Sequence, residues 1–292
     1  MSETRSTRPW RLLALAACLM FLAGCSGLRL AYDNADLWVR WRADQYLDMH
    51  GEKRERLHAR IAEFLAWHRE EALPRYARSL EEGSRRLTDG LSRDDLLRAY
   101  EEGRAQLARD LVAAASRLAD TVDTLDAGQI EHLERRFAAD NRKYASEFLS
   151  GSAESRRARR AERTVERLED WLGKLSDAQH DRVRRHSNEQ PLFDELRDRE
   201  RKRLQSELIA IARSRTAQAK LSELALQLVP GRGDAKYVAA AQAYTDAYFD
   251  LLVDVNRLAT PRQRERAIAR LHGFAGDLAA LSLARREPPG TR

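Results

Sequence analysis

Apolar residues recur at steps of three, four or seven along most of the chain, which is the spacing of one face of an α-helix. The stretches with this pattern are Leu57 to Leu73, Leu97 to Val122, Ile130 to Phe148, Val165 to Leu175, Phe193 to Leu228, Tyr237 to Leu258 and Ile268 to Leu281. No stretch alternates between apolar and polar residues with the period of two that marks a strand. The pattern predicts an all-α fold, a bundle of about seven to nine amphipathic helices.

Proline, glycine and the chain ends set the expected boundaries. A first helix is expected around Leu30, Leu37 or Trp38, and Trp41. Pro74 should stop or restart the next helix, because proline has no amide hydrogen. Residues 25–286 are expected to form one helical domain, and residues 287–292, which include two prolines and a glycine, a disordered tail.

The chain opens with a basic and then an apolar segment. Three arginines precede an apolar run from Leu12 to Leu22, which is long enough for a secretory signal peptide and too short to span a membrane. Leu22-Ala23-Gly24-Cys25 resembles the lipobox of bacterial lipoproteins. The resemblance implies that residues 1–24 are a cleaved signal peptide and that Cys25 carries diacylglycerol and an amide-linked palmitate. The alternative is an ordinary cysteine in a signal peptide that is cut elsewhere.

The residue after the cysteine, Ser26, bears on location. In Gram-negative lipoproteins an aspartate there favours the inner membrane, so the resemblance implies the periplasmic face of the outer membrane. No cofactor is expected apart from the lipid on Cys25. The mature chain would keep neither Cys18 nor a free thiol, and so no disulfide, cysteine metal ligand or thiol nucleophile.

Charge adds little to this picture. The chain carries 52 Lys and Arg against 46 Asp and Glu, a formal net charge of +6. Loss of residues 1–24 would remove three arginines and one glutamate and lower the charge to +4. The compartment, more than this mild charge, excludes nucleic acid as a partner. The densest basic run is Arg156, Arg157, Arg159 and Arg160.

We interpret that run and the segment after it as a solvated helix face, in which Glu162 and Glu166 are interleaved with Arg159 and Arg163 at steps of three or four and form ion pairs. The alternative is contact with anionic lipid headgroups or peptidoglycan.

A leucine, a capping residue and a glutamine three residues later recur three times, at Leu125-Asp126-x-x-Gln129, Leu175-Ser176-x-x-Gln179 and Thr260-x-x-Gln263. Each predicts a capping box, in which the first side chain accepts from a free amide of the helix and the glutamine reaches back. The repeats also resemble the LTxxQ boxes of periplasmic stress chaperones of the Spy and CpxP type. That resemblance implies client binding.

Aromatic and polar residues gather in two segments. One follows Cys25, and the other reads Trp-His-Arg-Glu-Glu-Ala-Leu-Pro-Arg-Tyr from Trp67 to Tyr76. Together they resemble a family of proteobacterial lipoproteins of unknown function, which implies a membrane-anchored helical protein and no particular reaction. The candidate functional or structural cluster is Tyr32, Asn34, Trp41, Trp67, His68, Arg69, Pro74 and Tyr76.

His68 lies on the apolar stripe of its expected helix, so it should face other helices. A buried imidazole needs hydrogen-bond partners for its nitrogens. The expected partners are on the preceding helix: Asn34, Asp36, Asp44 or Asp48. A structural role for His68 is our interpretation, and a ligand-binding or catalytic role is the alternative.

Enzyme chemistry has little support. The chain has no His-Glu-x-x-His, no Gly-x-Ser-x-Gly and no glycine-rich phosphate loop. Glu55-x-x-His58 and Asp177-x-x-His180 lack the further carboxylates of a metal bundle, so no metal site and no catalytic residue is predicted.

The sequence therefore predicts a lipid-anchored periplasmic binding protein, chaperone-like or an envelope-assembly factor. Its partners would be the membrane, through Cys25, and a protein client or envelope complex. The alternatives are an envelope hydrolase that uses His68 with a nearby carboxylate, and a structural subunit of an outer-membrane complex.

Overall fold

The computed structural model describes residues 27–88 and 90–284. The expected signal peptide, Cys25 and the expected tail from residue 287 lie outside them. The helices are α2 (Ala35–Leu47), α3 (Gly51–Trp67), α4 (Leu73–Thr88), α5 (Arg93–Asp123), α6 (Ala127–Tyr144), α7 (Ala153–Leu172), α8 (Asp177–Glu189), α9 (Asp194–Ser214), α10 (Ala217–Leu226), α11 (Ala235–Arg257) and α12 (Pro261–Leu283), with π-helical turns η1 (His68–Ala72) and η2 (Ala145–Leu149). Residues 27–33 are also helical. No strand occurs in the described ranges, so the all-α prediction is confirmed, and the eleven helices from α2 to α12 slightly exceed the seven to nine expected.

One additional helix comes from a break that periodicity does not show. The single stripe from Phe193 to Leu228 is two helices, α9 and α10. Arg215 ends α9 in the left-handed conformation, with φ 54°. Asp123, at the end of α5, then accepts from the backbone amide of Ala217 at 2.7 Å and so satisfies a free donor at the start of α10.

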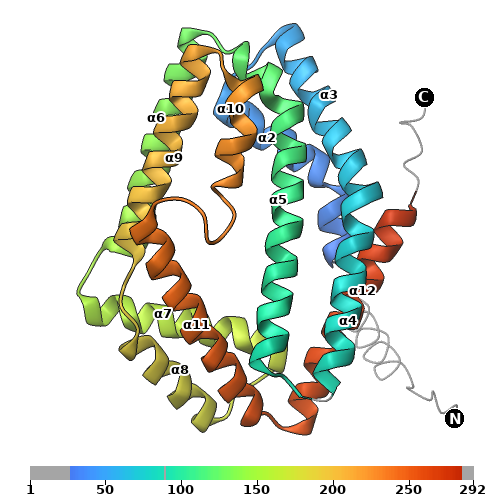
Figure 1. Cartoon of the computed structure of the whole chain (residues 1–292), viewed down its shortest axis with the longest axis vertical. Coiled ribbons are helices and arrows are strands. Elements are labelled where there is room, and N and C mark those ends of the chain that lie inside the picture. The colour runs from blue at the N-terminus through green and yellow to red at the C-terminus, as the bar shows by residue number, and fades with distance from the viewer. Residues whose placement is uncertain (1–26, 89, 285–292) are drawn as a thin grey trace, which may run out of the picture.

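Figure 1 shows a frame of helices around α5. The line α3–η1–α4 runs down one side of the view, α6 and α9 lie together along the other, and α7, α8 and α11 close the lower end. α12 packs along α4 in the most extensive helix pairing, and α10 packs along α5. The carboxyl-terminal helix is thus placed against the segment that follows His68.

Three clusters of buried apolar residues connect the helices. The first contains Met49, Leu57, Ile61, Leu125, Ile130, Leu133, Ile209 and Ala212, and so joins α3, α6 and α9. Helix α2 packs against it through the partly buried Val39, Ala43, Tyr46 and Leu47. The second joins α7, α8 and α11 through Ala161, Leu168, Leu175, Val183, Leu251 and Val255. The third joins α5, α9 and α10 through Ala119, Ile211, Ala217 and Leu224. Because α9 contributes to two clusters, it connects the upper part of the frame with its centre.

All three predicted capping boxes are present, with both reciprocal hydrogen bonds, at Asp126/Gln129, Ser176/Gln179 and Thr260/Gln263. Their glutamines also bridge separate helix pairs. The amides of Gln179 and Gln263 bond each other in both directions at 3.2 Å. Gln129 donates to the backbone oxygen of Asp48 at 3.2 Å and accepts from Lys53 at 3.2 Å. The boxes therefore fix tertiary packing as well as helix starts.

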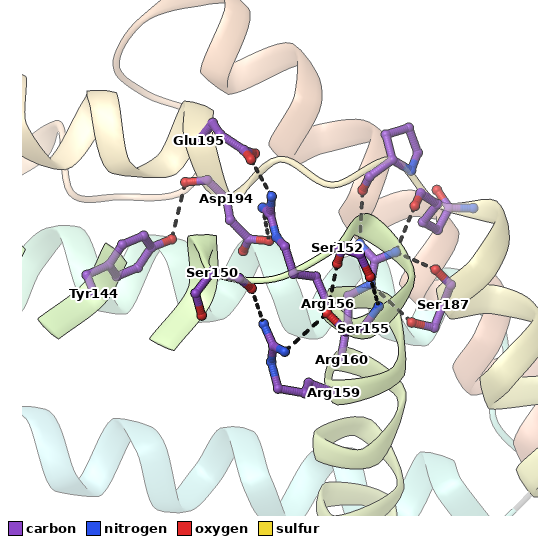
Figure 2. Close-up of polar contacts among 12 residues, drawn as sticks. Tyr144, Ser150, Ser152, Ser155, Arg156, Arg159, Arg160, Ser187, Asp194 and Glu195 are labelled. Atoms are coloured by element: carbon purple, nitrogen blue, oxygen red, sulfur yellow. Dashed lines mark hydrogen bonds and ion pairs between the residues drawn. The ribbon is translucent and has the colours of Figure 1, made fainter. Parts of the chain in front are cut away.

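The basic run at the start of α7 binds the end of α8 and the start of α9 (Figure 2). The expectation that this run is a solvated helix face is therefore wrong. Arg156, whose side chain is 10% exposed, pairs with Asp194 and Glu195 at the start of α9. Arg160 donates to the backbone oxygens of Ser187, Gln190 and Pro191, which end α8. Burial lowers the pKa of Arg160. These guanidinium groups satisfy carbonyls at a helix end, a need that the local charge pattern does not reveal.

Candidate functional site

The eight candidate residues fall into separate places. Five of them, the His68 cluster, lie in mutual contact near the junction of α3 and α4: Tyr32, Trp67, His68, Arg69 and Tyr76. Asn34 and Trp41 are exposed on the first helix. Pro74 is in the first turn of α4, directly after the π-helical turn η1.

A π-helical turn places His68. Residues His68–Ala72 form η1, and the backbone amide of Leu73 bonds the oxygen of His68, five residues back. The proline at position 74 has no amide to donate and would crowd the preceding turn of a regular helix. The wider turn lets the helix restart at Leu73, one of the two outcomes expected at Pro74. Such bulges are frequent at functional sites.

Aromatic rings enclose the imidazole of His68. The ring centroids of Tyr32, Phe64, Trp67 and Tyr76 lie 5.9, 5.8, 6.5 and 6.1 Å from that of His68. Its side chain is 19% exposed. The prediction that His68 faces other helices is confirmed, because these rings come from residues 27–33, α3 and α4.

The predicted polar partners of His68 are wrong. Tyr32 supplies the hydroxyl, 2.9 Å from Nδ1, and Asp110 of α5 lies 3.8 Å from Nε2. Of the expected partners, Asp44 bonds His58, and the amide of Asn34 donates to the oxygen of Leu30. Asp48 lies beside His50, and Asp36 pairs with Arg40. The helix turns these side chains away from His68.

Asp110 links the cluster to α5. It is 8% exposed, and its Oδ2 accepts from the hydroxyl of Tyr76 at 2.5 Å. Its Oδ1 is buried with no hydrogen-bond partner. Burial lowers the pKa of His68, and burial together with the Asp110 hydrogen bond raises the pKa of Tyr76. Near pH 7 the cluster therefore holds a neutral imidazole and a neutral phenol.

Arg69 ties the cluster to the end of α12. Its Nη1 donates to the backbone oxygen of Leu281 at 3.0 Å, its Nη2 lies 3.6 Å from Asp33, and its guanidinium stacks on Tyr32. A neighbouring cavity of about 350 Å³ is lined by Tyr32, Arg69 and residues 282–284, and His68 is not among its lining residues. An enclosed imidazole that does not line the cavity indicates a role for His68 in packing and not in catalysis.

The first helix presents a different surface. Its hydrogen bonds continue through Asn34, from Asn34 to Leu30 and from Trp38 to Asn34. Six exposed positions of this helix share one helical face, which we call the outer face: Leu30, Asn34, Leu37, Trp38, Trp41 and Gln45. None of these six is charged, although two other exposed residues of the helix, Arg29 and Asp33, are. Leu30, Leu37, Trp38 and Trp41 are 66, 68, 61 and 55% exposed, half of the large hydrophobic residues exposed over the described chain. Sequence reasoning noted these aromatic residues but not that they share an outward face.

The sequence matches the profile of a family of unknown function, DUF6279, over residues 45–228. The chain belongs to this family. The prediction of a family without an assigned function is thus confirmed. No curated protein and no solved structure matches the chain.

The DUF6279 segment contains the Trp67–Tyr76 motif and Asp110, but not all of their partners. Tyr32, which bonds His68, precedes the segment, and Leu281, which binds Arg69, follows it. The outer face also lies almost wholly before it. In this protein, segments outside the family match therefore complete the His68 cluster.

Among residues 27–88 and 90–284, no group of three or more His, Cys, Asp or Glu side chains is placed to hold a metal ion. No helix within the same ranges is long and apolar enough to cross a membrane.

Proposed function

We propose that the chain is a lipid-anchored binding protein on the periplasmic face of the outer membrane, with a chaperone-like or envelope-assembly role toward a protein client. The lipobox at Cys25 supports the anchor. The observation that carries the binding part of the proposal, a contact made by the chain itself, is the outer face of the first helix, whose six residues are exposed, largely apolar and uncharged. A contiguous surface of this kind marks contact with a membrane or a protein.

The position of the outer face favours the membrane as its contact. Five Cα–Cα steps separate Cys25 from Leu30, so the two lie within about 18 Å of each other. Tryptophan is enriched at membrane–water interfaces, and the apolar side of an interfacial helix enters the headgroup boundary. With the outer face on the membrane beside the anchor, the remaining helices face the periplasm and the client.

Vesicle binding tests this contact separately from the lipid. A mature form that begins at Ser26 is mixed with phosphatidylethanolamine–phosphatidylglycerol vesicles and sedimented. Leu37→Ser should lower the bound fraction about tenfold, because one large apolar side chain leaves the interface. Leu228→Ser is the matched control, since Leu228 is 56% exposed but lies far along the chain, after α10.

Equal effects of the two substitutions would contradict a role for the outer face. If the mature form did not bind vesicles and a crosslinker at position 41 captured a protein in cells, the outer face would be the contact for the client.

The anchor has its own test. Cys25→Ser should leave the chain uncleaved and without acyl label in cells fed a labelled fatty acid. Cleavage at the normal position in this variant would contradict lipoprotein processing. Ser26→Asp should shift the labelled protein toward the inner-membrane fraction, and no shift would contradict outer-membrane sorting.

In-cell crosslinking and mass spectrometry distinguish the two client roles. Many unrelated envelope proteins, enriched under envelope stress, would support the chaperone-like role, whereas one stoichiometric partner would support an assembly factor or structural subunit. The hydrolase alternative has a carboxylate, Asp110, near His68. We do not favour it, because four aromatic rings enclose the imidazole.

A further inference from the structure

A mostly apolar cavity of about 310 Å³ lies where the end of α4 and the starts of α5 and α12 meet α7 and α11. These helix ends are at the lower end of Figure 1. Its walls include Leu87, Leu96, Leu168, Trp171, Leu252 and Val255. Small-molecule sites are typically apolar cavities of about 300–1,000 Å³ with a few polar groups that orient the ligand. The size and walls suit one slender apolar chain.

The charged groups of this cavity are both cationic. Arg167 and Arg264 line it, together with the uncharged polar side chains of Tyr248 and Asn256. Arg264 donates from Nη2 to the backbone oxygens of Ala259, at 2.9 Å, and Asn256, at 3.4 Å. Its Nε is buried and has no hydrogen-bond partner. A buried donor without an acceptor costs free energy, so its partner is expected from outside the described chain.

No carboxylate of the described residues forms an ion pair with either arginine. Three other arginines with a similarly buried, unpaired Nε have a carboxylate on their other nitrogens, namely Arg104, Arg156 and Arg201. Arg136 and Arg157 share the unpaired Nε and the lack of a carboxylate partner, but neither lines this cavity. Arg264 therefore differs from the other arginines in combining an unpaired Nε and no anion with a place at the wall of an apolar cavity. That combination of charge and surface matches a ligand with an anionic head and an apolar chain.

We propose that this cavity binds a single-chain anionic amphiphile of the fatty-acid class. The acyl chain lies among the leucines and Trp171, and the carboxylate accepts hydrogen bonds from Arg264 and Arg167. A guanidinium group binds a carboxylate through paired, charge-assisted hydrogen bonds. The small volume favours one chain over a two-chain phospholipid. This site is distant in the fold from the outer face and does not depend on the proposed membrane contact.

Photocrosslinking tests the proposal on the lipidated full-length protein in bilayer nanodiscs. The probe is laurate with a diazirine on its chain, and labelled peptides are identified by mass spectrometry. Labels are expected around residues 87–96, 167–172 and 248–256. Arg264→Gln, which keeps a side-chain donor for the two carbonyls, should reduce labelling about tenfold through loss of the charged hydrogen bonds. Arg262→Gln is the control, because Arg262 is exposed on the same helix and does not line this cavity.

Arg167→Gln keeps the test decisive if Arg264→Gln unfolds, since Arg167 is exposed and has no partner among the described residues that its loss would orphan. It should reduce labelling while the melting temperature stays unchanged. Equal labelling by a dodecanol probe of the same length would overturn the anionic requirement. Labels confined to the first helix, or unchanged in both cavity variants, would overturn the site itself. These outcomes leave the vesicle test of the outer face untouched.

Discussion

The outer face of the first helix and the His68 cluster contain the same kinds of residue and use them differently. Trp38 and Trp41 are 61 and 55% exposed, whereas the His68 ring is surrounded by Tyr32, Trp67 and two further aromatic rings. Tyr32 and Asn34, two residues apart on one helix, point to the two different regions. The aromatic residues near the start of the chain thus belong to two regions. The His68 cluster stabilises the fold, and the outer face is exposed for contact with a membrane or a partner.

The largest expected effect is on vesicle binding and comes from substitutions on the outer face alone. Trp38→Ser with Trp41→Ser should weaken vesicle binding about a hundredfold, because each indole contributes about 1.5 kcal/mol at the interface. The free energy of unfolding should change by less than about 0.5 kcal/mol, since both side chains are exposed. Sedimentation and denaturant titration measure the two quantities. Leu97→Ser with Leu228→Ser, two exposed leucines elsewhere, should change neither.

A substitution in the His68 cluster should instead affect the stability of the fold. His68→Ala should lower the free energy of unfolding by about 2–3 kcal/mol, because it removes ring packing on four sides and the Tyr32 hydrogen bond. Vesicle binding should be unchanged. His50→Ala is the control, since the His50 side chain is 81% exposed. An unchanged melt together with lost client capture would make His68 a functional residue and contradict the structural assignment.

Acid should destabilise the packed regions without affecting the outer face. Burial, with Arg182 and Arg160 nearby, lowers the pKa of His186 to about 4, and burial also lowers the pKa of His68. Between about pH 4 and 6.5 the unfolded chain binds a proton at His186 and the folded chain does not, so the stability present above pH 6.5 is lost as the pH falls, and His68 acts in the same direction. His186→Gln should remove about 2 kcal/mol of this pH-dependent loss. Denaturant titrations at pH 7 and 4.5 compare the two chains, and an identical pH dependence would contradict a buried neutral His186.

The smallest expected effect on stability comes from loss of the single hydrogen bond between Tyr32 and His68. Tyr32→Phe keeps the stacked ring on His68 and removes the hydroxyl 2.9 Å from Nδ1. The free energy of unfolding should fall by about 1 kcal/mol. If the substitution instead weakened vesicle binding as strongly as the tryptophan changes, Tyr32 would belong functionally to the outer face.

Local signals predicted most of the fold. Helical periodicity gave the all-α architecture, and the Asp, Ser or Thr with Gln at the third position gave three capping boxes, because both depend on residues a few positions apart. The break at Arg215 was missed, since an arginine carries no signal for the left-handed conformation. The reciprocal amide pair of Gln179 and Gln263 was missed as well, because each glutamine already has a local role in its own box.

The candidate site was predicted less completely. The motif located His68, but its carboxylate neighbour, Asp110, lies on the later helix α5 and not on the preceding helix, where the partners were expected. The basic run failed for a similar reason. Acidic residues stand at helical spacing within this segment, such as Glu162 three residues after Arg159. Arg160 nevertheless binds the carbonyls of Ser187 and Gln190, which only the tertiary fold brings near. Side-chain direction on the first helix also depends on which face the other helices cover.

Quenching of tryptophan fluorescence by brominated lipids tests the central contrast most directly. The lipidated full-length protein is placed in vesicles in two versions, one that keeps only Trp41 and one that keeps only Trp67, with the other tryptophans changed to Phe. Lipids brominated near the headgroup should strongly quench Trp41 and leave Trp67 unquenched, because only the outer face would meet the membrane. Equal quenching of both, or a Trp41 that is quenched by aqueous iodide but not by the lipid, would contradict the account.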